Sequence, residues 1–217
     1  MSYRFERKFL IYPLSIKEME TFLKLHPLNF RKTYQDRYIN SIYYDTEDFK
    51  MYFQNINGFS EREKIRVRWY GEEKENFKNP KLEVKIRNTY LGKKISYSIN
   101  NYNIKTNLNQ LLETKDSNEA KILLLENLRP NILVKYKRKY FESFDKKIRI
   151  TLDSDLEFTK IEPANPKIFS ATKKIDDEII EIKYSSNFQK EALDLMSKIP
   201  LRLTRYSKYV RGIQEVY

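Results

Sequence analysis

The sequence contains no cysteine, and this absence excludes two structural devices. Without cysteine, the chain can form neither a disulfide scaffold nor a thiolate metal site. Glycine is also scarce, with only 4 among 217 residues, and neither a GxxxxGK[ST] nor a GxGxxG pattern is present. Because both patterns use glycine to bring the backbone close to phosphate, the sequence argues against P-loop and Rossmann sites.

Long apolar runs are missing as well. No run approaches the roughly 20 residues of a membrane-spanning helix. The N-terminus is charged, with Arg4, Glu6 and Lys8, and does not resemble a signal peptide. We therefore expect a cytoplasmic protein, and association with a membrane through a separate partner stays open. The single histidine, His26, follows a predicted helix and is expected to be structural.

The sequence is rich in positive charge, and its composition is that of a folded protein. Its hydrophobic content of 40%, with 14% aromatic residues, argues against global disorder. At 217 residues the chain fits one domain over residues 1–217 with a sizeable core. The net charge of +12 predicts an anionic partner: nucleic acid, nucleotide, polyphosphate or a membrane surface.

Charge and apolar character alternate strictly over residues 63–70, which indicates a β-strand. Because side chains point to opposite faces along a strand, one face there is apolar and the other is cationic. The cationic face carries Lys64, Arg66 and Arg68. The same alternation recurs over 81–87, 147–153 and 180–184. A solvated sheet face normally mixes both charge signs with Ser and Thr, so the recurrence predicts a continuous cationic surface.

The remaining pattern predicts further strands and a few helices. Strands are predicted over 3–12, 37–45, 61–71, 81–87, 94–99, 132–141, 147–155 and 179–184. Helices are predicted after a capping box formed by Ser15 and Glu18, after Thr46, within 103–128, and after Asn187. Residues 157–177 are predicted to form a loop with one extended piece, and the tail 201–216 an extended segment.

Many antiparallel strands with helices on one side predict an α+β fold. Closure into an eight-stranded β-barrel with flanking helices would remove the exposed sheet edges. With the aliphatic faces turned outward against the helices, the Arg and Lys faces would line a tunnel. Burying so many cations unpaired is too costly, so such a tunnel has to be wet and filled by a polyanion in use.

A series of short motifs resembles a known family. In order, they are Glu6-Arg7-Lys8, Tyr43-Tyr44-Asp45-Thr46, Lys64-Ile65-Arg66-Val67-Arg68-Trp69-Tyr70-Gly71, Leu82-Glu83-Val84-Lys85, Leu128-Arg129-Pro130, Arg149-Ile150-Thr151-Leu152-Asp153, Ile180-Glu181-Ile182-Lys183-Tyr184 and Tyr206-Ser207-Lys208-Tyr209. Together they resemble the VTC domain, the polyphosphate polymerase module of the vacuolar transporter chaperone complex. That family belongs to the triphosphate tunnel metalloenzymes, with the CYTH phosphatases and cyclases.

The resemblance implies an eight-stranded antiparallel tunnel that binds ATP at a divalent metal, Mn²⁺ or Mg²⁺, and transfers the γ-phosphate to polyphosphate. It implies catalytic roles for Arg66, Arg68, Lys85, Arg138 and Lys208. It implies substrate-binding roles for Lys8, Arg149, Lys183 and Ser207. The implied metal ligand is Glu181, with Glu6 and Glu83 as further candidates.

One departure bears on the choice of branch. The CYTH branch opens with Glu-x-Glu-x-Lys, but Arg4 stands where the first Glu would be, which leaves Glu6 and Lys8. This favours the VTC branch over a hydrolase with a carboxylate-rich metal site. If the product is exported, a separate membrane protein has to supply the pore.

Several alternatives stay open. Glu181 can pair with Lys183 instead of binding metal, and Glu6 and Glu83 can balance interior cations. The chain can be a tunnel triphosphatase, in which water accepts the phosphoryl group. It can also be a non-catalytic module that binds polyphosphate or RNA. Specific nucleic-acid binding is disfavoured because the tyrosines fit packing better than base stacking; these are Tyr70, Tyr136, Tyr206 and Tyr209.

Overall fold

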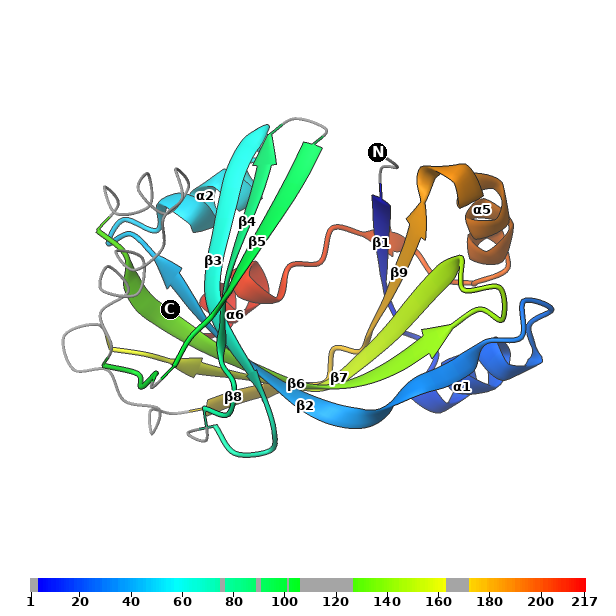
Figure 1. Cartoon of the computed structure of the whole chain (residues 1–217), viewed down its shortest axis with the longest axis horizontal. Helices are drawn as coiled ribbons and strands as arrows, with labels where there is room; N and C mark the ends of the chain where they lie inside the picture. The colour runs from blue at the N-terminus through cyan, green and yellow to red at the C-terminus, as the bar shows by residue number, and fades with distance from the viewer. Residues whose placement is uncertain (1–3, 75–76, 89–90, 101, 106–126, 163–171) are drawn as a thin grey trace. The chain divides into compact units, whose positions relative to one another are not determined.

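The structure is a computed structural model, and it describes residues 4–74, 77–88, 91–100, 102–105, 127–162 and 172–217. Strands dominate the described residues, and short helices accompany them (Figure 1). The strands are β1 (Arg4–Leu10), β2 (Arg31–Asp45), β3 (Glu61–Tyr70), β4 (Lys81–Asn88), β5 (Leu91–Ser98), β6 (Arg129–Glu142), β7 (Ile148–Lys160), β8 (Thr172–Ile175), β9 (Ile179–Ser185) and β10 (Leu203–Thr204). The helices are α1 (Ile16–Leu25), α2 (Lys50–Ile56), α5 (Gln189–Ser197), α6 (Lys208–Val216) and a 3₁₀ turn, η1 (Ser186–Phe188).

The strands pair in the order β10-β1-β9-β7-β6-β2-β3-β4-β5, and β8 pairs with β7. The pairs β1–β9, β7–β9, β2–β3, β3–β4 and β4–β5 are antiparallel, which confirms the α+β class with an antiparallel sheet. The predicted count of eight strands is too low, because the described residues form ten. Two of them, β8 and β10, have only 4 and 2 residues, too short for an alternating pattern to reveal. The pairing order of the described strands is open rather than closed into a barrel.

The chain forms two compact units, and strands β2, β6 and β7 contribute residues to both. Unit 1 comprises Met1–Tyr38, Tyr136–Leu156 and Lys174–Tyr206. Unit 2 comprises Ile39–Lys135, Glu157–Lys173 and Ser207–Tyr217. The single domain over residues 1–217 stays a prediction.

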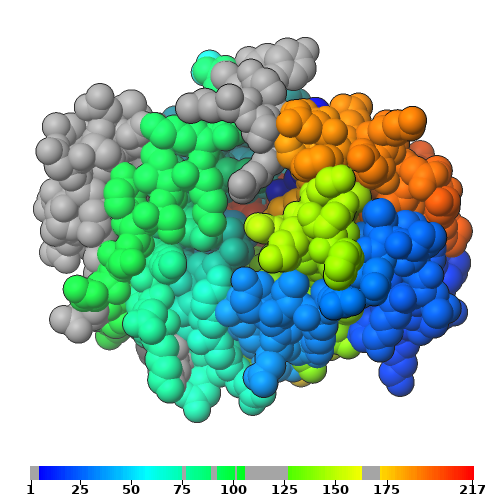
Figure 2. All heavy atoms as spheres, turned by 45° about the vertical axis from the view of Figure 1, so that its right-hand side comes forward, coloured from blue at the N-terminus to red at the C-terminus, as the bar shows by residue number. Residues whose placement is uncertain are grey.

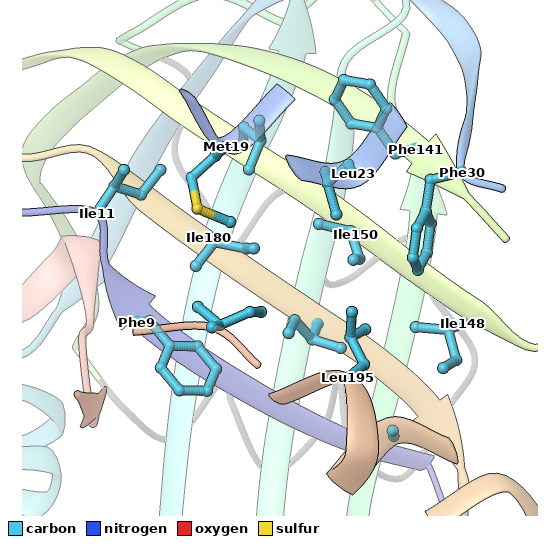
Figure 3. Packing of buried hydrophobic residues seen from close by; sticks show 14 of the residues in the cluster. Phe9, Ile11, Met19, Leu23, Phe30, Phe141, Ile148, Ile150, Ile180 and Leu195 are labelled. Carbon is cyan, nitrogen blue, oxygen red and sulfur yellow. The ribbon is translucent and has the colours of Figure 1, made fainter. Parts of the chain in front are cut away.

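The core of unit 1 lies between its sheet and the helices α1 and α5 (Figure 3). Alternate residues of β7 and β9 point into it, among them Ile150 and Ile180, both fully buried. Met19 and Leu23 of α1 and Leu195 of α5 pack against these strand residues. Burying each such side chain contributes roughly 1.5–3 kcal/mol. The apolar face of this part of the sheet is therefore held by helices, and its charged face is turned the other way.

The two helices of unit 1 begin differently. At α1 the predicted capping box is confirmed, because the Ser15 hydroxyl accepts from the Glu18 N–H at 3.3 Å and the Glu18 carboxylate accepts from the Ser15 N–H at 2.8 Å. At α5 the predicted cap is wrong: Asn187 lies in η1, and Phe188 is the N-cap residue. Atoms of α5, in orange, lie at the surface in Figure 2. Leu193 of this helix is half exposed.

Unit 2 is built on the meander β3–β4–β5, as predicted. Ile65, Val67 and Trp69 of β3 are fully buried, and Leu82 and Val84 of β4 lie opposite them. These residues form one apolar cluster with residues from β2 and β6. The opposite face of the same three strands carries the predicted cations.

The prediction of an extended tail over 201–216 is wrong, because Lys208–Val216 is the helix α6. Ser207 caps it by accepting from a backbone N–H. Tyr209 and Ile213, four residues apart, are both buried, and Arg211 pairs with Glu215 one turn later at 2.9 Å. This spacing of four is the helical signal that the tail carried.

Other boundaries also differ. Strand β2 begins at Arg31, earlier than the predicted 37, because both faces of its first residues are exposed and show no alternation. Strand β7 continues to Lys160, and β8 is the extended piece expected in the segment 157–177. Most of the helical pattern predicted over 103–128 lies outside the described residues. None of the helices in the described part of the chain is long and apolar enough to cross a membrane.

Candidate functional site

Strand β3 of unit 2 presents the cationic face that its alternation predicted. Lys64, Arg66 and Arg68 are half-buried, and the residues between them point into the core. On this face Arg66 lies opposite Tyr43 of β2 and Glu83 of β4, and Arg68 lies opposite Ser41 of β2. Cross-strand partners share a face, so the sheet register brings these polar side chains together.

Glu83 is the centre of this cluster. Its Oε2 lies 2.7 Å from Arg66 Nε, 2.6 Å from Arg66 Nη2 and 3.6 Å from Arg68 Nη1. Its Oε1 accepts from Lys94 Nζ of β5. Glu83 is 6% exposed, and burial alone raises its pKa. The charges of Arg66, Arg68 and Lys94 outweigh burial and lower the pKa of Glu83 to about 2, so it stays ionised.

A row of three lysines crosses the sheet beside this cluster. Lys64 of β3 lies opposite Lys85 of β4, and Lys85 lies opposite Lys94 of β5. Like charges placed opposite each other destabilise a sheet, so an anion bound over this row relieves their repulsion. Lys94 is absent from the site predicted from the sequence. Because Lys93 and Lys94 are adjacent, the sequence alone does not show which of the two shares a face with Lys85.

The start of α6 lies against β3. Ser207 is the N-cap of α6 and also accepts from Lys64 Nζ at 3.0 Å. Lys208, the first residue of the helix, is 9% exposed. Unit 2 therefore brings the predicted Ser207 to the cationic face of the meander, and Lys208 follows it directly in the chain.

Glu181 of β9 is the centre of a second charged cluster, in unit 1. It is 5% exposed and contacts Lys183 directly, Lys8 Nζ at 3.6 Å and Arg138 Nη2 at 3.9 Å. Lys8 Nζ also contacts Glu6 at 3.2 Å. Strand register explains the contact between Lys8 and Glu181, which lie opposite each other across β1 and β9. Glu6 and Lys8, like Glu181 and Lys183, lie two residues apart on one strand and therefore share a face.

Arg138 of β6 is held by a carboxylate that was absent from the predicted site. Its Nε and Nη2 donate to the two oxygens of Asp153 at 2.6 and 2.7 Å, a two-point contact that fixes the guanidinium plane. Asp153 is fully buried. Burial alone lowers the pKa of Arg138, but the Asp153 charge outweighs it and raises that pKa above its ordinary value. The alternation of Arg149, Thr151 and Asp153 along β7 carried the signal that Asp153 shares this face.

Arg149 lies at the exposed end of the same face. It is opposite Lys183 in the register of β7 and β9, and its Nε donates to Glu142 of β6 at 2.9 Å. Its side chain is 66% exposed. Unit 1 thus gathers six of the predicted residues on the polar face of β1, β9, β7 and β6; they are Glu6, Lys8, Arg138, Arg149, Glu181 and Lys183.

Comparison with known protein families identifies the chain. A family model described as the VTC domain matches residues 3–217. The chain belongs to the VTC domain family. The resemblance seen in the short sequence motifs is therefore confirmed over nearly the whole length of this VTC domain. A search of curated proteins found no match to it.

Solved structures share the fold of this VTC domain. A candidate adenylate cyclase from Vibrio parahaemolyticus has a TM-score of 0.56 at 12% identity, over 98% of both chains. A candidate adenylyl cyclase from Hippeastrum, for which a dominant triphosphatase activity is reported, has a TM-score of 0.57 at 12% identity, over 99% of this chain and 96% of the other. A candidate adenylate cyclase from Bacillus halodurans gives 0.54 at 16% identity, over 98% of this chain and 96% of the other. At these identities the likeness establishes the fold alone.

The divalent metal that the family implies would need carboxylate ligands in this VTC domain. Among the described residues, no group of three or more His, Cys, Asp or Glu side chains surrounds one point. Glu6 and Glu181, however, both contact Lys8 Nζ, so two carboxylates converge on one cation. Mg²⁺ is usually held by one or two carboxylates together with waters and substrate phosphates. This pair supplies that number of carboxylates. Both oxygens of Glu181 face cations of the protein, Oε1 facing Lys183 and Oε2 facing Lys8, as both oxygens of Glu83 also do, so an ion bound here would take the place of those cations.

Proposed function

We propose that this VTC domain is a polyphosphate polymerase, which transfers the γ-phosphate of ATP to the end of a growing polyphosphate chain. The observation that carries the proposal is the lysine row Lys64–Lys85–Lys94 beside two arginines in a chain of this family. Such a surface is suited to a linear polyanion, because successive phosphates each meet a cation. Phosphoryl transfer needs little covalent help, since its transition state is stabilised by positioned cations.

In unit 2 we assign Arg66, Arg68, Lys85 and Lys208 to the phosphates undergoing transfer, with Ser207 assisting beside Lys208. The guanidinium groups make planar two-point contacts with phosphate oxygens, whereas the lysines act as point charges. Because Glu83 holds Arg66 at two nitrogens, the guanidinium is already oriented before an anion arrives. Pre-orientation of this kind lowers the entropy lost on binding.

In unit 1 we assign Arg138, Lys8, Arg149 and Lys183 to phosphate binding. The terminal phosphate of the polyphosphate acceptor is the nucleophile. We assign Glu181, with Glu6, to a Mg²⁺ or Mn²⁺ ion. When bound, that ion supplies charge neutralisation of the phosphates.

A second function is supported by one comparison. The Hippeastrum protein, which shares the fold, has a reported triphosphatase activity, and the same cations would stabilise hydrolysis if water were the acceptor. The two functions differ in the acceptor alone. A module that binds polyphosphate without turnover is the third outcome that an assay has to separate.

The test is to incubate the purified chain with ATP and Mn²⁺, with and without a short polyphosphate primer, and to separate products by chain length. A ladder of lengthening chains that requires metal supports the polymerase. Release of orthophosphate alone supports the triphosphatase, and tight polyphosphate binding without turnover supports the binding module. Glu181→Gln is expected to abolish turnover while leaving polyphosphate binding in EDTA intact.

A matched pair of lysine variants tests the cationic face. Lys85 and Lys93 are exposed lysines on neighbouring strands, but Lys93 lies opposite Ile86 and therefore points to the other face. We expect Lys85→Ala to weaken polyphosphate binding about tenfold, as loss of a charged hydrogen bond does, and Lys93→Ala to change it little. Equal effects of the two substitutions would show that net charge, rather than this face, binds the anion.

A further inference from the structure

The helix that carries Lys208 is attached to the sheet by a buried hydrogen bond. The hydroxyl group of Tyr209 donates to Asp45, the last residue of β2. Tyr209 is 2% exposed and Asp45 is fully buried. Asp45 belongs to the motif Tyr43-Tyr44-Asp45-Thr46, and Tyr209 to the motif Tyr206-Ser207-Lys208-Tyr209. Neither residue has a role in the phosphate-binding assignments made above.

Asp45 is itself fixed by the backbone around it. Its carboxylate accepts from the N–H groups of Thr46 at 2.8 Å, Met51 at 2.9 Å and Tyr52 at 3.0 Å. Met51 and Tyr52 lie in the first turn of α2, where N–H groups have no partner within the helix. With the Tyr209 hydroxyl as a further donor, Asp45 is a rigid anchor that joins β2, α2 and α6.

The ring of Tyr209 is fixed as well. It stacks on Tyr43 with ring centroids 5.1 Å apart, and the Tyr43 hydroxyl accepts from Arg66 Nη1 at 3.0 Å. Further along α6, a Cβ added at Gly212 would lie 2.6 Å from side-chain carbons of Ile132 and Phe158. The helix is therefore pressed against the sheet, and small shifts of its start are resisted on two sides.

From these contacts we propose that Tyr209 is a positioning residue for Lys208. Its hydroxyl group, held by Asp45, fixes the first turn of α6, so that Lys208 and Ser207 are presented to phosphate at the cationic face of β3. Tyr209 itself touches no substrate. The proposal rests on the proposed function of Lys208 as a phosphate-binding residue, and it adds a role for Tyr209 and Asp45.

Tyr44 provides a matched control. Its hydroxyl group is also buried and lies 2.8 Å from the Tyr102 hydroxyl, but it belongs to the apolar cluster on the other face of β2. Tyr209→Phe and Tyr44→Phe therefore each remove one buried hydroxyl group and keep the ring. Both are expected to lower the melting temperature of the full chain. Only Tyr209→Phe is expected to change the affinity for inorganic tripolyphosphate, measured by calorimetry in EDTA.

We expect Tyr209→Phe to weaken tripolyphosphate binding about tenfold, the size of coupling found for residues in contact, and Tyr44→Phe to change it less than about twofold. The decisive comparison uses Lys208→Ala. If Tyr209 acts through Lys208, adding Tyr209→Phe to Lys208→Ala changes the affinity less than about twofold. A purely structural role for Tyr209 gives instead the same loss in both backgrounds.

Each result has one meaning. Equal affinity of Tyr209→Phe and the unaltered chain, or additive losses with Lys208→Ala, overturns the positioning role alone. If the unaltered chain binds tripolyphosphate but makes no polyphosphate, the proposed polymerase fails and the positioning role is still scored by binding. If the unaltered chain binds no tripolyphosphate, both proposals are overturned.

Discussion

Glu83 contacts Arg66 at two guanidinium nitrogens, with Oε2 at 2.7 Å from Nε and 2.6 Å from Nη2. The carboxylate and the guanidinium come from neighbouring strands and face each other in the sheet register. Since Glu83 also contacts Arg68 and Lys94, one buried acid arranges three cations. This relationship explains how a cationic face folds without substrate, and it supports a role for Glu83 in orienting cations.

A first prediction concerns that role. Glu83→Gln removes the charge that orients Arg66, and we expect kcat/KM for ATP to fall about tenfold, as loss of a charge-assisted hydrogen bond does. The concentration of Mn²⁺ that gives half-maximal activity is expected to stay unchanged. Steady-state kinetics at varied Mn²⁺ measures both. A large rise in the Mn²⁺ requirement would instead identify Glu83 as a metal ligand.

The depressed pKa of Glu83 predicts how stability depends on pH. Its pKa is about 2 in the folded chain against an ordinary value of 4.5, so its charge stabilises the fold above the ordinary value. That contribution is lost as pH falls from 4.5 towards 2. Urea unfolding at about pH 6 and about pH 3 should therefore show that the difference in unfolding free energy between the unaltered chain and Glu83→Gln is smaller at the lower pH. A difference that is the same at both pH values would contradict the lowered pKa of Glu83.

The two Arg–carboxylate pairs between β6 and β7 are predicted to differ in strength. Asp153→Asn leaves the Arg138 charge buried without its two-point partner, and we expect a loss of about 3–5 kcal/mol in unfolding free energy. Glu142→Gln breaks the pair with Arg149, whose side chain is 66% exposed, and the expected loss is below about 1 kcal/mol. Chemical denaturation measures both, and similar losses would argue against the buried clamp.

Close packing of α6 predicts a difference between two glycines. Gly212→Ala places a methyl group 2.6 Å from Ile132 and Phe158, and overpacking of this kind costs about 1–3 kcal/mol. Gly92 in β5 has only one backbone oxygen near the added Cβ, at 4.0 Å, so Gly92→Ala serves as the control. Thermal unfolding should show a lower melting temperature for Gly212→Ala alone. If both variants melt like the unaltered chain, α6 is not tightly packed.

Strand alternation allowed much of the fold and the site to be predicted. The cationic face of β3 follows from a period of two, and the contact between Arg66 and Glu83 follows from pairing two such strands. The capping box at Ser15 is equally local, since its two residues lie within one turn. Where the chemistry depends on neighbours in sequence or on alternation, the sequence suffices.

Other features depend on tertiary contacts and escaped prediction. Asp153 is a partner of Arg138 only because β6 and β7 pair, and its motif alone does not name that partner. The start of β2 at Arg31 carries no apolar alternation because both faces are exposed there. Helix α6 reads as an extended segment in the sequence because the repeat of Tyr209 and Ile213 spans only about one turn, too little to outweigh the nearby aromatic and β-branched residues.

The central claim is tested most directly by the fate of the γ-phosphate of ATP. The chain is incubated with Mn²⁺, a polyphosphate primer and ATP labelled at the γ-phosphate, and the label is followed over time by chain length. The proposed polymerase predicts label in chains that grow steadily longer, with none incorporated in EDTA. Label that appears only in orthophosphate, with the primer unchanged, would contradict the claim.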